Sequence, residues 1–278
     1  MSSAARPTPA RLRAGPSALL ADTARAMLPH RDEDPGTPAD DAATEPGDER
    51  VGVTALERGL AILDVLGAAD GGLALKELSA RTALSKATVL RLAVSLERYG
   101  YLRREDSGHF HLGPTLWRLG AVFRRHLDLE RHVRPVLEAL VSLTQESASF
   151  WVPHGGERMC LYRVNSPRTA RSHVEEGELS PLGKGAGGHV IAHHLGRPTA
   201  LAAQIESEGV AVTLGDRDPD VASVAAPVHG PDGEFLGALV LAGILGRFEP
   251  RVPDFKPIVK QAAGSLWRHA GGAGISGV

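Results

Sequence analysis

Basic side chains gather between residues 81 and 104 of a 278-residue chain whose formal net charge is −2. The segment carries one acidic residue, Glu97, and six basic ones, which are Arg81, Lys86, Arg91, Arg98, Arg103 and Arg104. A local excess of guanidinium and ammonium groups attracts phosphate oxygens even when the whole chain is close to neutral. The segment therefore predicts contact with nucleic acid.

A helix is predicted to position the central cations. Ser85 is a favourable N-cap and Gly100 a favourable stop, so the helix is expected to lie between them. Its apolar residues recur at the spacing of a single helix face, and they are Val89, Leu92, Ala93 and Leu96. That face is expected to pack inward, which leaves Lys86, Thr88 and Arg91 free to contact DNA.

Further helices and a hairpin complete the predicted module. Thr54 and Glu57 have the spacing of a capping box and predict the start of a first helix. A second helix follows, ahead of the basic one. Residues 101–112 alternate in the manner of two short strands around a turn at Asp106, which predicts a hairpin. The elements predict a winged helix-turn-helix domain over residues 53–113.

The remainder of the chain has a different texture. Pro114 predicts the first turn of a linker helix over residues 114–128. Beyond it, short β-rich runs at 149–152, 159–164, 222–228 and 235–241 alternate with helical stretches near 189–194, 200–208 and 257–270. This mixture predicts an antiparallel sheet packed by helices over residues 129–272. The fold class is therefore expected to be α+β.

The N-terminal stretch and the single cysteine bear on where the protein works. Residues 1–52 are rich in Ala, Pro, Asp, Glu, Gly and Thr, and we expect a disordered extension because so little apolar surface can be buried. No stretch reaches the roughly 18–20 apolar residues that span a bilayer, and no secretion signal is evident. Cys160 has no partner for an intramolecular disulfide. We expect a cytoplasmic protein with no membrane partner.

Three patterns resemble catalytic or metal sites, and each lacks the context that such a site needs. Residues 183–188 match G-x-G-x-x-G, but no buried strand precedes them and no βαβ series follows. His189 and His193 share a helix face at a spacing that can bind zinc, without an evident third ligand. Cys160 lies in an apolar run, where a buried and inert thiol is expected. We predict no catalytic residue, metal or cofactor; a nucleotide-binding enzyme with an accessory winged helix is the alternative class.

Several stretches, in this order, resemble the isocitrate lyase regulator (IclR) family of bacterial transcription factors. They are VTALERGLAILDVL, LKELSARTALSKATVLRLAVSLERYGYLRR, HFHLGPTLWRLG, VRPVLEALVSLT, PLGKGAGGHVIAHHLG and VAAPVHGPDGEFLGALVLAG. The resemblance covers residues 53–270. It implies an N-terminal winged helix-turn-helix, a linker helix that dimerises and a C-terminal GAF-like domain that binds a small effector.

The resemblance also implies the DNA contacts. The lysine, threonine and arginine of the family's recognition helix match Lys86, Thr88 and Arg91. Ser85 and Lys86 lie at the helix N-terminus, where N–H groups and the helix dipole favour a phosphate. Arg91 can reach a guanine edge or a phosphate oxygen. The wing is expected to contact phosphates or the minor groove through Arg103, Arg104 and His109.

For the effector site, the alignment implies that backbone groups of Ala186 and Gly187 cradle a small carboxylate. The same alignment places around the cavity Thr169, Ser172, Thr213, Ser223, Val240 and Ala242. Thr213 stands where acid-binding members carry an acid, and Val240 and Ala242 stand where they carry hydroxyls, so the cavity loses hydrogen-bonding capacity. We expect a ligand more apolar than a short hydroxy or keto acid. A degenerate domain that binds no ligand is the alternative.

These expectations combine into one function. We expect a sequence-specific regulator, a repressor, whose affinity for a double-stranded DNA operator is changed by the effector. One module alone would bind weakly, so we expect a homodimer or a dimer of dimers with recognition helices about 34 Å apart on a palindromic site. The alternative is a ligand-independent regulator that responds to a protein partner.

Overall fold

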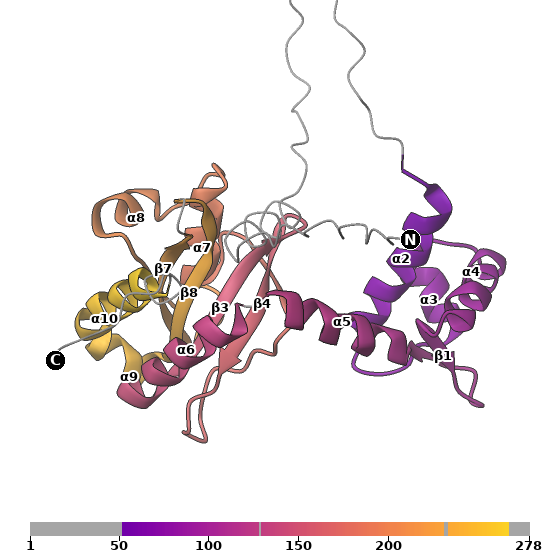
Figure 1. The fold of residues 1–278 in the computed structure, drawn as a ribbon, viewed down its shortest axis with the longest axis horizontal. Helices are drawn as coiled ribbons and strands as arrows, with labels where there is room; N and C mark the ends of the chain where they lie inside the picture. The colour runs from indigo at the N-terminus through magenta and orange to yellow at the C-terminus, as the bar shows by residue number, and fades with distance from the viewer. Residues whose placement is uncertain (1–51, 128, 231–232, 267–278) are drawn as a thin grey trace, which may run out of the picture. The chain divides into compact units, whose positions relative to one another are not determined.

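The computed structural model describes residues 52–127, 129–230 and 233–266 (Figure 1). The predicted extension over residues 1–52 lies almost wholly outside the described residues, as does the end of the predicted C-terminal domain. The described residues fall into two compact units, one ending at His126 and the other beginning at Leu127.

Helices and a two-stranded hairpin form the N-terminal unit. In chain order they are α2 (Thr54–Gly67), α3 (Leu75–Thr82), α4 (Lys86–Arg98), β1 (Leu102–Arg104), β2 (Phe110–Leu112) and α5 (Pro114–Leu127). The two strands pair antiparallel, with Arg103 opposite His111. The predicted helix-turn-helix and its hairpin are confirmed.

A small hydrophobic core holds these elements together. Ile62 from α2, Leu78 from α3, Val89 from α4 and Phe110 from β2 are fully buried in it. Ala93, one turn beyond Val89, is buried as well. The inward face predicted for α4 is therefore confirmed, and its packing fixes which way the opposite face of the helix points.

The start of α2 differs from the prediction, whereas the start of α4 agrees with it. The carbonyl of Val53 accepts the N–H of Glu57 at 3.1 Å, so Thr54 already lies inside the first turn and no side chain caps the helix. The capping box predicted at Thr54 was wrong for that reason. At α4, Ser85 Oγ accepts the N–H of Thr88 at 3.2 Å, which confirms the predicted N-cap.

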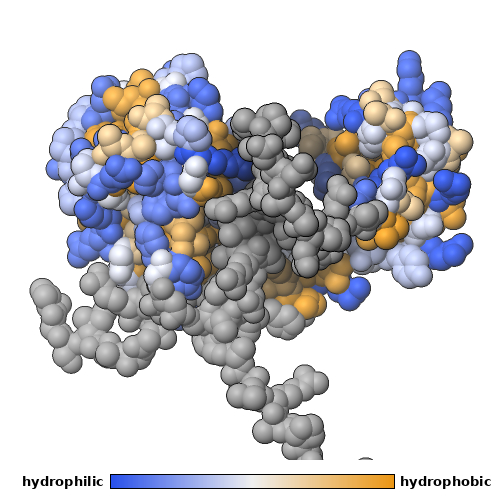
Figure 2. Space-filling model, turned by 90° about the horizontal axis from the view of Figure 1, so that it is seen from above, coloured by the Kyte–Doolittle hydropathy of each residue, from blue (hydrophilic) through white to orange (hydrophobic). Residues whose placement is uncertain are grey.

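Large hydrophobic side chains remain exposed on the N-terminal unit. In Figure 2, hydrophobic residues in orange lie among hydrophilic ones on this unit, at the right of the view. α2 exposes Leu56 and Leu60, and α5 exposes Phe123 and Trp117, the last with 82% of its surface accessible. Exposed apolar side chains that gather on helices are typical of a surface that contacts another protein molecule.

The C-terminal unit is built on a six-stranded antiparallel sheet in the order β5-β4-β3-β8-β7-β6. The strands are β3 (Ser147–His154), β4 (Glu157–Val164), β5 (Leu179–Pro181), β6 (Ala211–Leu214), β7 (Val221–His229) and β8 (Phe235–Ile244). The helices are α6 (Glu130–Thr144), α7 (Gly185–His194), α8 (Ala202–Glu208), α9 (Leu245–Phe248) and α10 (Val252–Ser265), with a 3₁₀ turn at Glu249–Arg251. The α+β class is confirmed. Strands β5 and β6 were not predicted, because so few residues carry little periodicity.

Helices cover both faces of this sheet, α6 and α10 on one face and α7 on the other (Figure 1). Side chains along β8 alternate between the two cores. Leu239 and Leu241 pack with α6 and α10, whereas Ala238, Val240 and Ala242 pack on the side of α7. Polar groups on either face are consequently withdrawn from water. Among the described helices, none is both long and apolar enough to cross a bilayer.

The turn from β2 into α5 depends on a glycine without room for a side chain. A Cβ at Gly113 would lie 2.2 Å from the carbonyl oxygen of Gly100, whereas one at Gly120, within α5, meets nothing within 4 Å. We predict that Gly113→Ala lowers the free energy of unfolding by about 1–3 kcal/mol through this clash. Gly120→Ala should raise it by about 0.5–1 kcal/mol, because alanine favours the helix. Urea unfolding measures both, and equal effects of the two substitutions would contradict the steric argument.

Candidate functional site

The exposed face of α4 is basic and free of acidic partners among the described residues. Lys86 and Arg91 are exposed, and neither forms an ion pair with a described carboxylate. Thr88 is half-buried, and its hydroxyl lies 2.9 Å from Ser85 Oγ at the start of the helix. The face thus presents two cations without an ion pair, one of which, Lys86, lies at the positive end of the helix dipole, and this arrangement attracts phosphate.

The hairpin beyond α4 carries the other predicted DNA-binding residues. Arg103 and Arg104 are exposed on β1. Arg103 Nη1 lies 3.0 Å from Glu105 Oε1, and this hydrogen bond is the main cause that holds the pKa of Glu105 below its usual value. Arg104 lies over the ring of Phe110, 5.1 Å from its centroid. His109 Nδ1 is 3.1 Å from Ser107 Oγ. Arg104 is therefore the freer of the two arginines to meet a phosphate.

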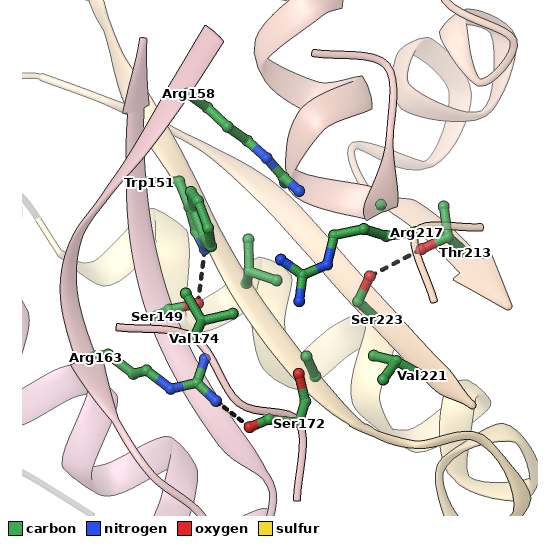
Figure 3. Close-up of a pocket in the computed structure, with 13 residues that line it drawn as sticks. Ser149, Trp151, Arg158, Arg163, Ser172, Val174, Thr213, Arg217, Val221 and Ser223 are labelled. Atoms are coloured by element: carbon green, nitrogen blue, oxygen red, sulfur yellow. Dashed lines mark hydrogen bonds between the residues drawn. The ribbon is translucent and has the colours of Figure 1, made fainter. Parts of the chain in front are cut away.

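A cavity of about 40 Å³ lies in the C-terminal unit on the α7 side of the sheet (Figure 3). The residues that line it are Ser149, Trp151, Arg158, Arg163, Ser172, Val174, Gly185, Thr213, Arg217, Val221, Ser223, Val240 and Ala242. Several polar groups on its walls are paired with each other. Trp151 Nε1 donates to Ser149 Oγ at 2.8 Å, and Thr213 Oγ1 lies 2.8 Å from Ser223 Oγ.

The N-terminus of α7 closes one end of this cavity. The N–H of Gly185 donates to Asp216 Oδ2 at 2.6 Å, and the N–H of Ala186 donates to Ser223 Oγ at 3.1 Å. A Cβ at Gly187 would lie 2.6 Å from a methyl of Val240 and 2.8 Å from Arg158 Nη1. Glycine at this position lets the arginine side chain approach the helix.

Three arginine side chains reach the cavity. Arg158 retains only 3% of its accessible surface, lies over the Trp151 ring at 4.5 Å, and its Nε has no hydrogen-bond partner. Arg163 Nε donates to Asn165 Oδ1 at 2.8 Å, and its Nη2 donates to the Ser172 carbonyl. Burial, and then the charge of Arg217, lower the pKa of Arg158 to about 10.

Comparisons with known proteins find relatives of the helix-turn-helix domain and of most of the chain. The model of the IclR helix-turn-helix domain matches residues 55–106. The HTH-type transcriptional regulator BhcR of Paracoccus denitrificans is 28% identical over 242 residues, which cover 77% of this chain and 86% of that protein. The chain carries an IclR helix-turn-helix domain and is similar over most of its length to IclR-family regulators. It is a DNA-binding transcriptional regulator, since its relatives carry that activity in their names.

Solved structures show the same fold beyond the helix-turn-helix. A crystal structure of an IclR regulator from a Silicibacter species superposes with a TM-score of 0.67 at 25% identity, covering 79% of this chain and 97% of that one. An IclR homologue from Microbacterium hydrocarbonoxydans, complexed with 4-hydroxybenzoate, superposes with a TM-score of 0.67 at 19% identity, covering 78% and 99%. Each of the two therefore spans residues from both units of this chain.

The structure brings most of the predicted effector residues to one place. On the cavity wall lie Ser172, Thr213, Ser223, Val240 and Ala242. Ala186 and Gly187 are buried and do not line the cavity, but each adjoins a lining residue, Ala186 through its N–H to Ser223 Oγ and Gly187 through its close approach to Val240. Thr169 departs from the prediction, because it is exposed and does not line the cavity. The chain around it is anchored at Ser166 and Ser172, so the residues between them face solvent.

The sequence patterns did not predict the three arginines that line the cavity, Arg158, Arg163 and Arg217. Arg158 lies two residues before Cys160 on β4, and Cys160 was expected to be buried. Because alternate residues of a strand share a face, this spacing could have placed Arg158 on the same buried face. Arg163 carries no such signal, because strict alternation would place it on the face opposite Arg158. The register of β4 against β3 shifts between Phe150 and Trp151, and this shift turns Arg163 to the same face as Arg158. The expectation of an apolar ligand counted Thr213, Val240 and Ala242 and left these donors out.

The residues that the sequence analysis considered as metal or catalytic candidates have ordinary structural surroundings. His189 Nδ1 lies 2.6 Å from Thr199 Oγ1, and its Nε2 lies 3.2 Å from Asp216 Oδ2. Across the part of the chain that the structure describes, no three potential metal ligands gather. Cys160 is fully buried, and burial is the main cause that raises the pKa of its thiol to about 12. The thiol is therefore unreactive at neutral pH.

Asp216 ties the start of α7 to the loop after β6. Besides the bonds to Gly185 and His189, its Oδ1 lies 3.5 Å from Lys184 Nζ. Burial opposes ionisation of this carboxyl, but the Gly185 N–H and the neighbouring His189 outweigh it, so the pKa of Asp216 lies below its usual 3.8.

We predict that Asp216 stabilises the IclR-family fold at neutral pH and ceases to do so in acid. A carboxyl whose pKa is lowered by folding contributes stability above its unfolded pKa, and the contribution is lost as the pH falls through the folded value. Asp216→Asn should therefore destabilise the chain at pH 7 and flatten its loss of stability below about pH 4. Urea unfolding across this range measures the effect. The exposed Asp220→Asn is the control, and identical pH profiles for the two variants would refute the assignment.

Proposed function

We propose that this regulator binds an operator in double-stranded DNA through α4 and the wing, and that a small molecule in the C-terminal cavity changes this binding. The observation that carries the first half is the exposed face of α4, where Lys86 and Arg91 have no described carboxylate partner. The opposite face is held by the buried Val89 and Ala93. A rigidly held basic helix is the form in which many regulators enter the major groove.

Each predicted DNA-binding residue has a role in this proposal. Ser85 and Lys86 meet a phosphate at the N-terminus of α4, with Thr88 beside them. Arg91, farther along the exposed face, reads a base edge or grips the backbone. The wing adds phosphate or minor-groove contacts through Arg103, Arg104 and His109. Arg103 contacts Glu105 through Nη1, so it reaches a phosphate with its other guanidinium N–H groups or by exchanging Glu105 for the phosphate.

We propose that the working form is a homodimer or a dimer of dimers. Exposed Leu56 and Leu60 on α2, with Trp117 and Phe123 on α5, supply apolar surface that a second copy can bury. Pairing would set two recognition helices about 34 Å apart, to match a palindromic operator. Because its target is chromosomal DNA, the proposal places the protein in the cytoplasm, acting as a repressor that occupies its operator.

The cavity supports control by a small molecule. The homologue from Microbacterium hydrocarbonoxydans has the same fold and is complexed with 4-hydroxybenzoate. In this chain the cavity collects serine, threonine and arginine side chains between the sheet and α7. A ligand shifts operator affinity only if it binds the DNA-competent and DNA-incompetent arrangements unequally.

Substitution of Arg91 tests the DNA half of the proposal. We predict that Arg91→Ala weakens operator binding by about 1–3 kcal/mol, measured by gel-shift titration at fixed salt. Arg197→Ala removes the same charge from an exposed site in the other unit and should leave affinity unchanged. Unchanged affinity of the Arg91→Ala variant would contradict the proposed role of α4.

Footprinting tests the effector half. We expect the purified full chain to protect a palindromic site upstream of its own gene, and a metabolite that enters the cavity to alter this protection. Small anionic, neutral and aromatic compounds are titrated at constant ionic strength, since salt alone weakens DNA binding. Protection that responds to none of them would favour the ligand-independent alternative.

A further inference from the structure

We propose that the cavity takes a small dianion, two anionic groups on a short spacer, held by the guanidinium groups of Arg158, Arg217 and Arg163. The inference deepens the proposed function and rests on the cavity being the effector site. Figure 3 shows the three side chains turned toward the same space, two from β4 and one from the loop after β6.

Arg158 provides the first step. Its side chain is almost completely buried, its Nε has no hydrogen-bond partner, and no described carboxylate forms an ion pair with it. Its guanidinium also lies against Gly185, Gly187 and Gly188, at the positive end of α7. A buried cation beside a positive dipole is unfavourable unless an anion joins it. The glycines leave the space that the arrangement needs.

The neighbouring arginines add to the uncompensated charge. Arg163 donates to two neutral acceptors, the Ser172 carbonyl and the side-chain oxygen of Asn165. Of the three, Arg217 alone forms an ion pair, with its Nη1 3.5 Å from Glu178 Oε1. Glu178 acts on Arg158 and Arg163, and Asp216 on Arg158, only through space, and burial still lowers the pKa of both arginines. Two buried guanidinium groups therefore have no described carboxylate within ion-pair distance. A ligand with two negative charges balances them, whereas one with a single charge leaves a cation unpaired.

The size and the walls of the cavity limit the spacer. About 40 Å³ corresponds to roughly three water positions. The Arg217 side chain retains 27% of its surface and can yield further room by moving outward. Trp151, Val174 and Val240 provide apolar wall between the charged ends. Short dicarboxylates and short phosphorylated carboxylic acids share this chemistry, and direct binding distinguishes them.

Calorimetry on the full chain tests the ligand class. The probes are malonate and succinate, which are dianions, and phosphoglycolate, which also has two anionic groups but whose phosphate carries part of a third charge near pH 7. Butyrate and succinamide are the singly charged and neutral counterparts, and all are used at equal ionic strength. We expect at least one dianion to bind at least about tenfold more tightly than butyrate, because an additional hydrogen-bonded charge pair forms. A preference for succinate or malonate assigns a dicarboxylate, and a preference for phosphoglycolate assigns a phosphorylated acid. Equal binding of butyrate and the dianions, or binding of none, overturns the inference.

Variants of the arginines test how the anion is held. Arg158→Met keeps the length of the side chain and removes its charge, so dianion affinity should fall by about ten- to a hundredfold. Its thermal midpoint without ligand should not fall, because an uncompensated buried charge has been removed. Arg197→Met is the matched exposed control. If Arg158→Met unfolds, the half-buried Arg217→Gln serves instead and should also lose affinity. Unaltered dianion binding in a folded variant of either arginine overturns the inference.

Operator titration separates this inference from the proposed function. If the dianion binds in calorimetry but leaves operator affinity unchanged, the ligand class stands and effector control through the cavity fails. If a neutral compound changes operator affinity while no dianion binds, the ligand class fails and effector control stands.

Discussion

Burial of both faces of the six-stranded sheet is the constraint on which the C-terminal unit depends. Aliphatic side chains gain from this burial, and β8 divides them between the two cores by simple alternation. Polar side chains must instead find partners away from water. Ser149 accepts the indole N–H of Trp151, and Ser223 accepts the N–H of Ala186. Arg158 cannot be satisfied in this way, so the covering that stabilises the sheet also creates a place for an anion.

In the N-terminal unit, burial likewise separates the apolar face of α4 from its charged face. Val89 and Ala93 anchor one face of α4 in a small core, and this anchoring gives the opposite face a fixed direction. Lys86 and Arg91 gain no stabilising ion pair from a described carboxylate. Exposed cations cost the fold little, since water solvates them well. These two side chains therefore remain available to a ligand. Packing of the apolar face of α4 fixes the direction in which they point.

Local patterns in the chain were sufficient for much of the fold. Helical periodicity and the Ser85 cap located α4, and short runs of β-forming residues located the four longer strands of the sheet. The capping box at Thr54 failed because the Thr-x-x-Glu spacing also fits inside a first turn that has begun one residue earlier. Strands β5 and β6 escaped because their pairing, rather than their own residues, defines them. Thr169 was misplaced because its loop is held on either side by hydrogen bonds to other elements. Ser166 Oγ donates to the Gln145 carbonyl, and the Ser172 carbonyl accepts from Arg163.

The sequence by itself determined the basic helix and the residues at its exposed face, because these follow from neighbours within one or two helical turns. Only the tertiary structure decided the charge of the cavity. A register shift in the β3–β4 pairing turns Arg163 to the same side as Arg158, where strict alternation would separate them. Arg217 arrives from a loop that the sheet order carries to the start of α7. Contacts between residues so far apart in the chain depend on strand pairing, and no local pattern encodes that pairing.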